Sequence, residues 1–190
     1  LIFYIYRNGT DTFGTDGLLY HQEGIEVAQR LNEGASLFGI SYEFTWYTVF
    51  VGLAYHIFGI DRYLVSFINV IFAFISGIIL LKLALNHKYS FPNAAAISLT
   101  FLFFPNLVLW TADSRKEALL ILVSFLGWFS VQNFISSVRH NGNLIKNCLR
   151  IFFICLLMWF STLIRIYMFI PLFLGILTSQ VFLYMRTKRR

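Results

Sequence analysis

Apolar runs long enough to cross a lipid bilayer constrain this sequence more than any other feature. A bilayer core about 30 Å thick is crossed by about 20 helical residues. The cleanest run of this kind is Tyr63–Leu85. We therefore predict an all-α fold, a polytopic transmembrane helical bundle with about six apolar helices in residues 42–190. The predicted helices are Tyr42–Phe58, Tyr63–Leu85, Pro92–Trp110, Ala118–Ser137 and two within Leu149–Arg186, separated by breaks near Ser161–Arg165 and at Pro171.

The composition also indicates a membrane protein. Only 13% of the residues are charged and 58% are hydrophobic, whereas soluble domains carry about 25% charged residues. This balance excludes a disordered chain, a disulfide scaffold and an ordinary cytosolic enzyme. The net charge of +6 comes mainly from basic residues between and after the apolar runs. It therefore indicates membrane topology and contact with anionic headgroups rather than binding of nucleic acid.

The cysteines give no sign of a metal site. Cys148 and Cys155 lie in one apolar stretch, without a CxxC motif or a His/Cys cluster, and we interpret them as small apolar core residues. Neither a metal nor a cofactor is predicted.

The first 41 residues differ from the rest of the chain. Residues 1–6 form an apolar stub, which we interpret as the end of a first helix, and residues 7–41 form an external loop. Together with Glu43, this loop holds six of the nine acidic residues. Its second half, Leu18–Asn32, has one apolar helical face, which indicates an amphipathic helix lying in the membrane interface. That face consists of Tyr20, Val27 and Leu31. We expect residues 1–190 to form a single transmembrane domain of a longer protein.

Basic residues predict the orientation in the membrane. Residues 138–150 and 186–190 carry basic side chains and no acids, which places them on the cytoplasmic side. The acidic loop 7–41 and the charged segment 113–117 then lie on the outer side. Three full crossings between these two segments would put them on opposite sides. We therefore expect one apolar run, the short Tyr42–Phe58, not to cross fully.

Three groups of charged residues are candidates for chemistry, because ionisable groups at membrane depth are costly and usually functional or paired. They are Asp11 with Asp16 after the first helix, the segment 113–117, and Arg165. Each also has a structural interpretation. Aspartate is a favoured helix cap, the charges of 113–117 can pair locally, and an arginine can extend to the headgroups instead of binding a phosphate. The residues alone leave both interpretations open.

Short motifs follow one another along most of the chain. They are Asp16-x-x-x-Tyr20, an interfacial helix over Ile25–Leu31 that ends at Gly34, the run Tyr55–Asp61, Asn69 within a span, Phe104-Pro105-Asn106 at a helix end, and Arg115-Lys116-Glu117 before the next span. In this order they resemble the N-terminal half of the GT-C fold glycosyltransferases. These are polytopic enzymes that take sugars from polyprenyl-phosphate carriers, such as the dolichyl-phosphate-mannose mannosyltransferases. The resemblance covers about Leu1–Tyr167.

The resemblance implies a role for each candidate residue. An aspartate in the first external loop of this family is the catalytic base. Asp16 matches it through its spacing to Tyr20, and Asp11 is the alternative. Basic residues at the outer face hold the carrier phosphate, which matches Arg165. The charged second external loop of the family corresponds to Arg115, Lys116 and Glu117. No DxD pair is present, so the resemblance implies no metal.

The implied function is transfer of a sugar from a polyprenyl-phosphate carrier to an acceptor at the external or luminal membrane face. A carboxylate would accept the proton of the attacking hydroxyl, and cations would stabilise the leaving phosphate. Membrane lipid and the lipid-linked donor are the expected partners. The expected location is the bacterial cytoplasmic membrane, or the endoplasmic reticulum in a eukaryote. Two alternatives stay open: a Wzy-like polysaccharide polymerase or ligase, and a non-enzymatic transporter or membrane subunit.

Overall fold

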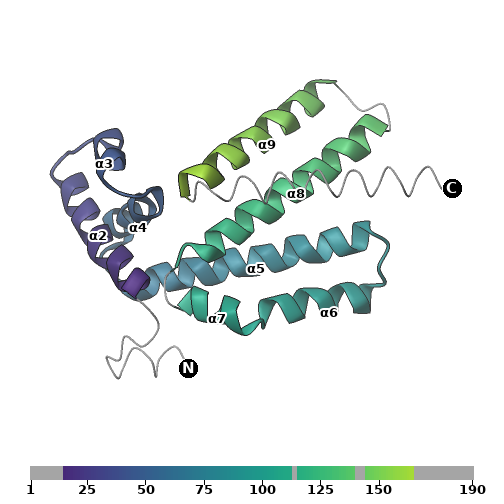
Figure 1. Cartoon of the computed structure of the whole chain (residues 1–190), viewed down its shortest axis with the longest axis horizontal. Helices are drawn as coiled ribbons and strands as arrows, with labels where there is room; N and C mark the ends of the chain where they lie inside the picture. The colour runs from purple at the N-terminus through teal and green to yellow at the C-terminus, as the bar shows by residue number, and fades with distance from the viewer. Residues whose placement is uncertain (1–14, 113–114, 140–143, 165–190) are drawn as a thin grey trace. The chain divides into compact units, whose positions relative to one another are not determined.

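The computed structural model describes residues 15–112, 115–139 and 144–164, and every regular element in these ranges is an α-helix (Figure 1). The predicted all-α fold is confirmed for this part of the chain. The chain divides into two compact units, Leu1–Leu122 and Val123–Arg190, and helix α8 runs from one into the other. The helices are α2 (Thr15–Asn32), α3 (Leu37–Glu43), α4 (Trp46–Phe58), α5 (Arg62–Asn86), α6 (Phe91–Leu102), α7 (Pro105–Ala112), α8 (Glu117–Arg139) and α9 (Leu144–Ile164).

Three of the described helices are long and apolar enough to cross a membrane. They are α5, the Glu117–Ser137 part of α8 and the Ile145–Ile164 part of α9. With 25 residues, α5 is about 38 Å long, which exceeds the thickness of a bilayer core of about 30 Å. The predicted helices Tyr63–Leu85 and Ala118–Ser137 therefore match α5 and α8. The chain has the helices of a membrane protein.

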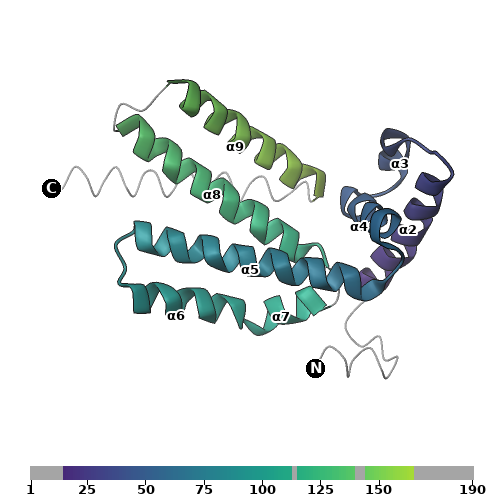
Figure 2. The same cartoon turned by 180° about the vertical axis from the view of Figure 1, so that it is seen from behind.

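In the first unit, α6 and α7 run back along α5 (Figures 1 and 2). In the second half of α5, the Gly77 carbonyl accepts a hydrogen bond from the Ser98 hydroxyl at 2.8 Å. In the first half of α5, the Ser66 hydroxyl donates to the Ala112 carbonyl at 3.0 Å. Hydroxyls bonded to backbone carbonyls are a usual way to join helices in apolar surroundings. The chain thus returns, after α7, to the level of the first turns of α5.

The predicted single helix Pro92–Trp110 is wrong, because the structure breaks it into α6 and α7. Proline has no N–H, and its ring disfavours helical backbone at the preceding residue. Here Pro105 starts α7, while α6 ends at Leu102. The Phe104 amide donates to the Phe101 carbonyl at 3.2 Å, so the last turn of α6 tightens before the chain restarts.

The predicted helix Tyr42–Phe58 is also divided. Tyr42 belongs to α3, and α4 begins at Trp46 after its N-cap, Thr45, whose hydroxyl oxygen accepts from the Thr48 amide. The 13 residues of α4 extend about 20 Å, well short of a bilayer core. The length of α4 agrees with the expectation that this run does not cross.

Two glycines let α2 and α4 pack closely. A methyl group at Gly24 would lie 2.5 Å from Val51 Cγ1. One at Gly52 would lie 2.5 Å from Val27 Cβ and 3.2 Å from the Gly24 carbonyl oxygen. Both distances to carbon are far below van der Waals contact, so the two helices approach at a point where only glycine fits. The predicted apolar face of α2 is directed at this contact, with Tyr20 and Val27 buried.

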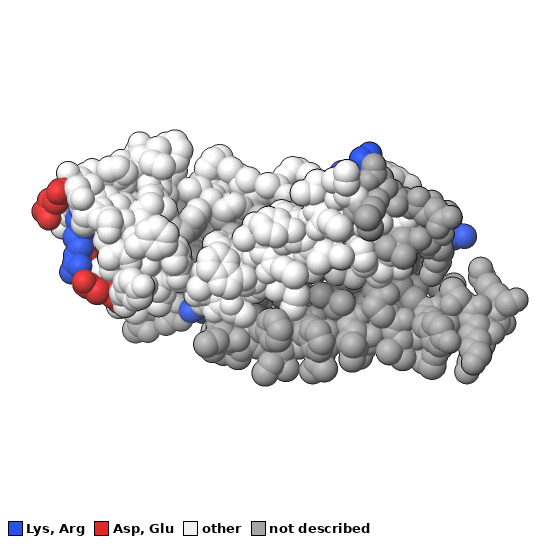
Figure 3. Space-filling view, turned by 90° about the horizontal axis from the view of Figure 1, so that it is seen from above, with Lys and Arg blue, Asp and Glu red and all other residues white. Residues whose placement is uncertain are grey.

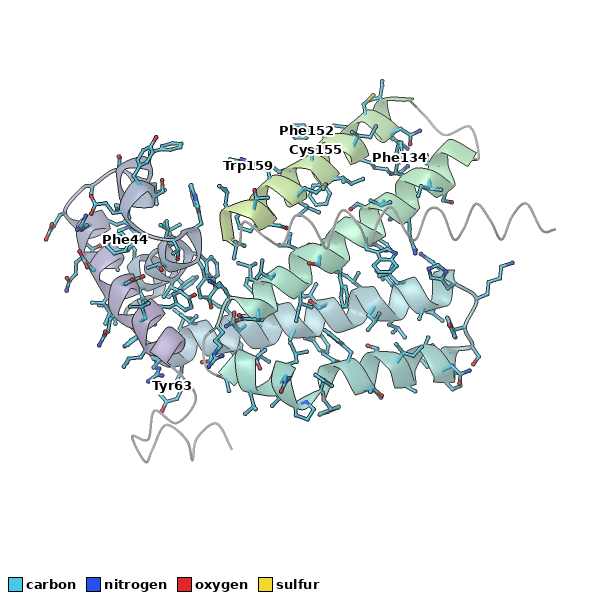
Figure 4. The ribbon with its side chains drawn as sticks, in the orientation of Figure 1. Phe44, Tyr63, Phe134, Phe152, Cys155 and Trp159 are labelled. Carbon is cyan, nitrogen blue, oxygen red and sulfur yellow. The ribbon has the colours of Figure 1, made fainter. Side chains whose placement is uncertain are left out.

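In the second unit, α8 and α9 line an open apolar hollow of about 300 Å³. Phe134 on α8 and Cys155 on α9 lie at it (Figure 4). Its lining consists of Val131, Phe134, Ile135, Ile151, Ile154 and Cys155. Cys148 and Cys155 are free thiols that are exposed on α9. The prediction that they are core residues is therefore wrong, because α9 directs both side chains away from the buried interior of the described residues.

The predicted basic loop 138–150 is mostly helix. Helix α8 continues to Arg139 and α9 starts at Leu144, so Lys146 and Arg150 lie in the first turns of α9. The sequence suggests a loop because basic residues interrupt the apolar pattern, yet lysine and arginine are good helix formers. The first stub, residues 1–6, and the predicted break at Pro171 lie outside the described residues.

The close α2–α4 contact predicts that Gly52→Ala lowers the stability of the protein. The added methyl group overlaps Val27, and such overpacking costs about 1–3 kcal/mol. The thermal unfolding midpoint in detergent, followed by tryptophan fluorescence, should fall. Gly39→Ala in α3 is the matched control, because its nearest neighbour is the Ser36 hydroxyl at 3.3 Å. A Gly52→Ala protein as stable as the Gly39→Ala protein would contradict the described packing.

Candidate functional site

A buried asparagine joins three elements at the start of α5. Asn69 is fully buried, and its Nδ2 donates to the Tyr47 hydroxyl of α4 at 3.2 Å and to the Arg115 carbonyl at 2.9 Å. Its Oδ1 accepts no hydrogen bond from any residue in the described ranges. An amide buried in an apolar helix is costly unless it is hydrogen-bonded. The two bonds of Nδ2 therefore fix α4 and the segment before α8 to α5.

Two tyrosines and a lysine continue this cluster. The rings of Tyr20 and Tyr47 meet edge to face, with centroids 4.9 Å apart. The Lys116 ammonium lies 5.4 Å from the centroid of the Tyr20 ring, in cation–π geometry. Burial raises the pKa of the Tyr47 hydroxyl above its ordinary value of 10, and the nearby Glu117 carboxylate adds to this. Tyr47 is therefore protonated at neutral pH.

A histidine lies beside this cluster on α2. His21 Nδ1 is 2.8 Å from the Tyr55 hydroxyl, and the two rings meet edge to face. Burial lowers the pKa of the His21 imidazole below its ordinary value of 6.5. The Arg62 guanidinium acts in the same direction, and Asp61 opposes it. His21 is thus mainly neutral at pH 7, and it hydrogen-bonds as an uncharged ring.

Two acidic residues of the first loop, and Glu43 just after it, have structural partners. Glu23 accepts a hydrogen bond from the Thr48 hydroxyl at 2.9 Å. Glu26 and Glu43 both pair with Arg30, at 2.7 and 2.6 Å. On the face in Figure 3, charged atoms gather at the edge near α2 and α3, and most of the neighbouring surface is white. These carboxylates hold α2 to α3 and α4, which makes them poor candidates for a base.

Of the predicted site residues, the structure describes Asp16, Arg115, Lys116 and Glu117. It brings Lys116 into contact with the helix that carries Asp16. Asp16 lies in the first turn of α2, one helical turn before Tyr20. Lys116 reaches the Tyr20 ring, Arg115 is held through its carbonyl, and Glu117 begins α8. The Lys116 side chain therefore reaches the turn of α2 that follows position 16. Asp11 and Arg165 lie outside the described residues, so the structure neither adds them to the cluster nor removes them.

Sequence reasoning missed Tyr47 and His21. Neither residue stands out by spacing or charge, because each gains its place from a contact between helices distant in the sequence. Asn69 was easier to find than Tyr47 and His21, because an amide within a long apolar run needs a hydrogen-bond partner. No group of three or more His, Cys, Asp or Glu side chains in the described ranges could hold a metal ion.

Comparison with known proteins assigns no family. No family model, no curated protein and no solved structure matches the chain. The cluster at the start of α5 is thus the basis for a functional proposal.

The lowered pKa of His21 predicts a pH-dependent stability. Above pH 6.5 the imidazole is neutral in both the folded and unfolded protein. As the pH falls below 6.5, the unfolded state binds a proton that the folded state resists, so the free energy of unfolding decreases. The unfolding midpoint in detergent should drop between pH 7.5 and 5.5, and the drop should be smaller in His21→Gln. The same substitution at exposed His56 is the control. An unchanged drop in His21→Gln would refute the assignment.

Proposed function

We propose that this chain is part of an integral membrane glycosyltransferase that uses a polyprenyl-phosphate sugar. One observation supports the proposal most directly. The Lys116 ammonium lies over the ring of Tyr20, and Tyr20 follows Asp16 by one helical turn in α2. This contact is compatible with a site in which a carboxylate from α2 and the Lys116 ammonium act together. The resemblance of the same motifs to the GT-C glycosyltransferases points to this chemistry.

The proposed reaction needs both kinds of charge. Asp16, or Asp11 in its place, accepts the proton of the acceptor hydroxyl, which is a poor nucleophile at neutral pH. Lys116, Arg115 and Arg165 hold the phosphate of the carrier and stabilise the charge that develops on it. Glu117, at the start of α8, balances the cations. The hydroxyl displaces the lipid phosphate directly from the anomeric carbon, with inversion of configuration.

Asp16→Asn should abolish transfer while leaving donor binding nearly unchanged. The substitution keeps the size of the side chain and removes its proton acceptor, which costs about 10²–10⁴-fold in rate. Transfer is measured with the protein in nanodiscs, with radiolabelled polyprenyl-phosphate mannose and polyprenyl-phosphate glucose as probes. Arg165→Ala should weaken donor binding instead, and Arg165→Lys should restore it only in part, because lysine keeps the charge but loses the planar fork.

The outcomes of these variants separate the possible bases. An Asp16→Asn protein with full activity moves the role to Asp11, and Asp11→Asn must then be inactive. If both variants stay active, the proposed mechanism is wrong. A wild-type protein that binds no polyprenyl-phosphate sugar would favour the transporter or membrane-subunit alternative.

The proposal also predicts that positions 16 and 114 are on the same side of the membrane. Single cysteines at 16, 114 and 140 are introduced after Cys148 and Cys155 have been replaced by serine. A membrane-impermeant maleimide added from outside should label 16 and 114 and leave 140 unlabelled. Labelling of 16 and 114 from opposite sides would exclude a common site.

A further inference from the structure

The hydrogen bond from Asn69 acts on the backbone next to Lys116. Asn69 Nδ2 donates to the Arg115 carbonyl at 2.9 Å, and the Arg115 carbonyl belongs to the peptide group that precedes Lys116. Fixing this carbonyl fixes the plane of that peptide group. Because this plane contains the Cα atom of Lys116, the hydrogen bond anchors the point from which the Lys116 side chain leaves the backbone. The ammonium at the end of this side chain lies 5.4 Å from the centre of the Tyr20 ring.

The second hydrogen bond of Asn69 supports the ring over which the Lys116 ammonium lies. Asn69 is fully buried in α5, the helix most clearly long enough to cross a membrane. Its second bond goes to Tyr47, and Tyr47 supports the Tyr20 ring edge to face at 4.9 Å. Asn69 thus touches both the backbone that carries the cation and the tyrosine that supports the ring beneath it. One side chain connects the two partners of the cation–π contact.

We infer that Asn69 is a positioning residue, which sets the Lys116 ammonium over Tyr20 by holding the Arg115 carbonyl. The inference rests on the proposed function in one respect, that Lys116 faces the carrier phosphate. The positioning itself does not require a substrate. Because the Lys116 ammonium is already ordered before the donor binds, donor binding carries a smaller entropy cost. Asn69 therefore tunes donor affinity and takes no part in proton transfer.

Amine labelling tests the inference without a substrate. The protein in nanodiscs is treated with an amine-reactive acetylating reagent, and the labelling rate of each lysine is followed by mass spectrometry. In Asn69→Leu, Lys116 should label about two- to fivefold faster, the factor that matches loss of a typical cation–π contact. Lys82 and Lys88, at the opposite end of α5, are internal references and should not change. Asn69→Ser, which is too short to reach Arg115, replaces Asn69→Leu if that variant does not fold.

Matched variants distinguish positioning from general loosening. Ser66→Ala removes a hydrogen bond from the same helix to Ala112 and should leave Lys116 labelling unchanged. Tyr47→Phe keeps the bond from Asn69 to Arg115 and should also leave it unchanged. Tyr20→Leu should raise the Lys116 rate as much as Asn69→Leu does, and the double variant should raise it no further, because both remove one contact.

Two results would overturn the inference. One is an unchanged Lys116 rate in both Asn69 variants. The other is a rise of similar size in Ser66→Ala or at Lys82 and Lys88, which would mean general loosening. If the labelling changes as expected and the wild-type protein transfers no sugar, the positioning role stands and the proposed function fails. If transfer is present, Asn69→Leu should raise KM for the polyprenyl-phosphate sugar more than it lowers kcat.

Discussion

The packing of α6 and α7 back along α5 brings together segments that are 46 residues apart in the sequence. Ser66 and Asn69 on α5 donate to the carbonyls of Ala112 and Arg115. Ala112 is the last residue of α7, and Arg115 lies in the segment between α7 and α8. The first turns of α5 therefore cap the end of α7 from the side. The charged segment before α8 is held at α2 and α4 as a result.

Polar side chains in this unit mostly serve to tie helices together. Ser98 bonds to a carbonyl of α5, and Ser76 bonds back to Phe72 within α5. In an apolar environment an unpaired hydroxyl costs several kcal/mol, which explains why both of these serine hydroxyls are directed at backbone carbonyls. Asn69 differs from these serines, because its amide joins α5 both to α4 and to the segment before α8. The candidate site is built around this asparagine.

The sequence allowed the long helices to be predicted because length and apolarity suffice for α5 and α8. It also carried a signal for the break before Pro105, because a proline inside an apolar run usually ends the helix before it, but the predicted span Pro92–Trp110 ran through this proline. Tyr20, Asn69 and Lys116 were visible as motif residues, yet their contacts depend on the return of α7. Tyr47 and His21 could not be found from spacing, because tertiary packing alone gives them partners.

The glycine contact between α2 and α4 has an evolutionary consequence. Position 52 has no room for a side chain because Val27 Cβ occupies the place of its methyl group. A larger residue at 52 is compatible with the fold only when position 27 becomes smaller. Among proteins related to this one, the side-chain volumes at these two positions should vary inversely. Such coupled variation would identify the α2–α4 contact even in sequences whose charged motifs can no longer be aligned.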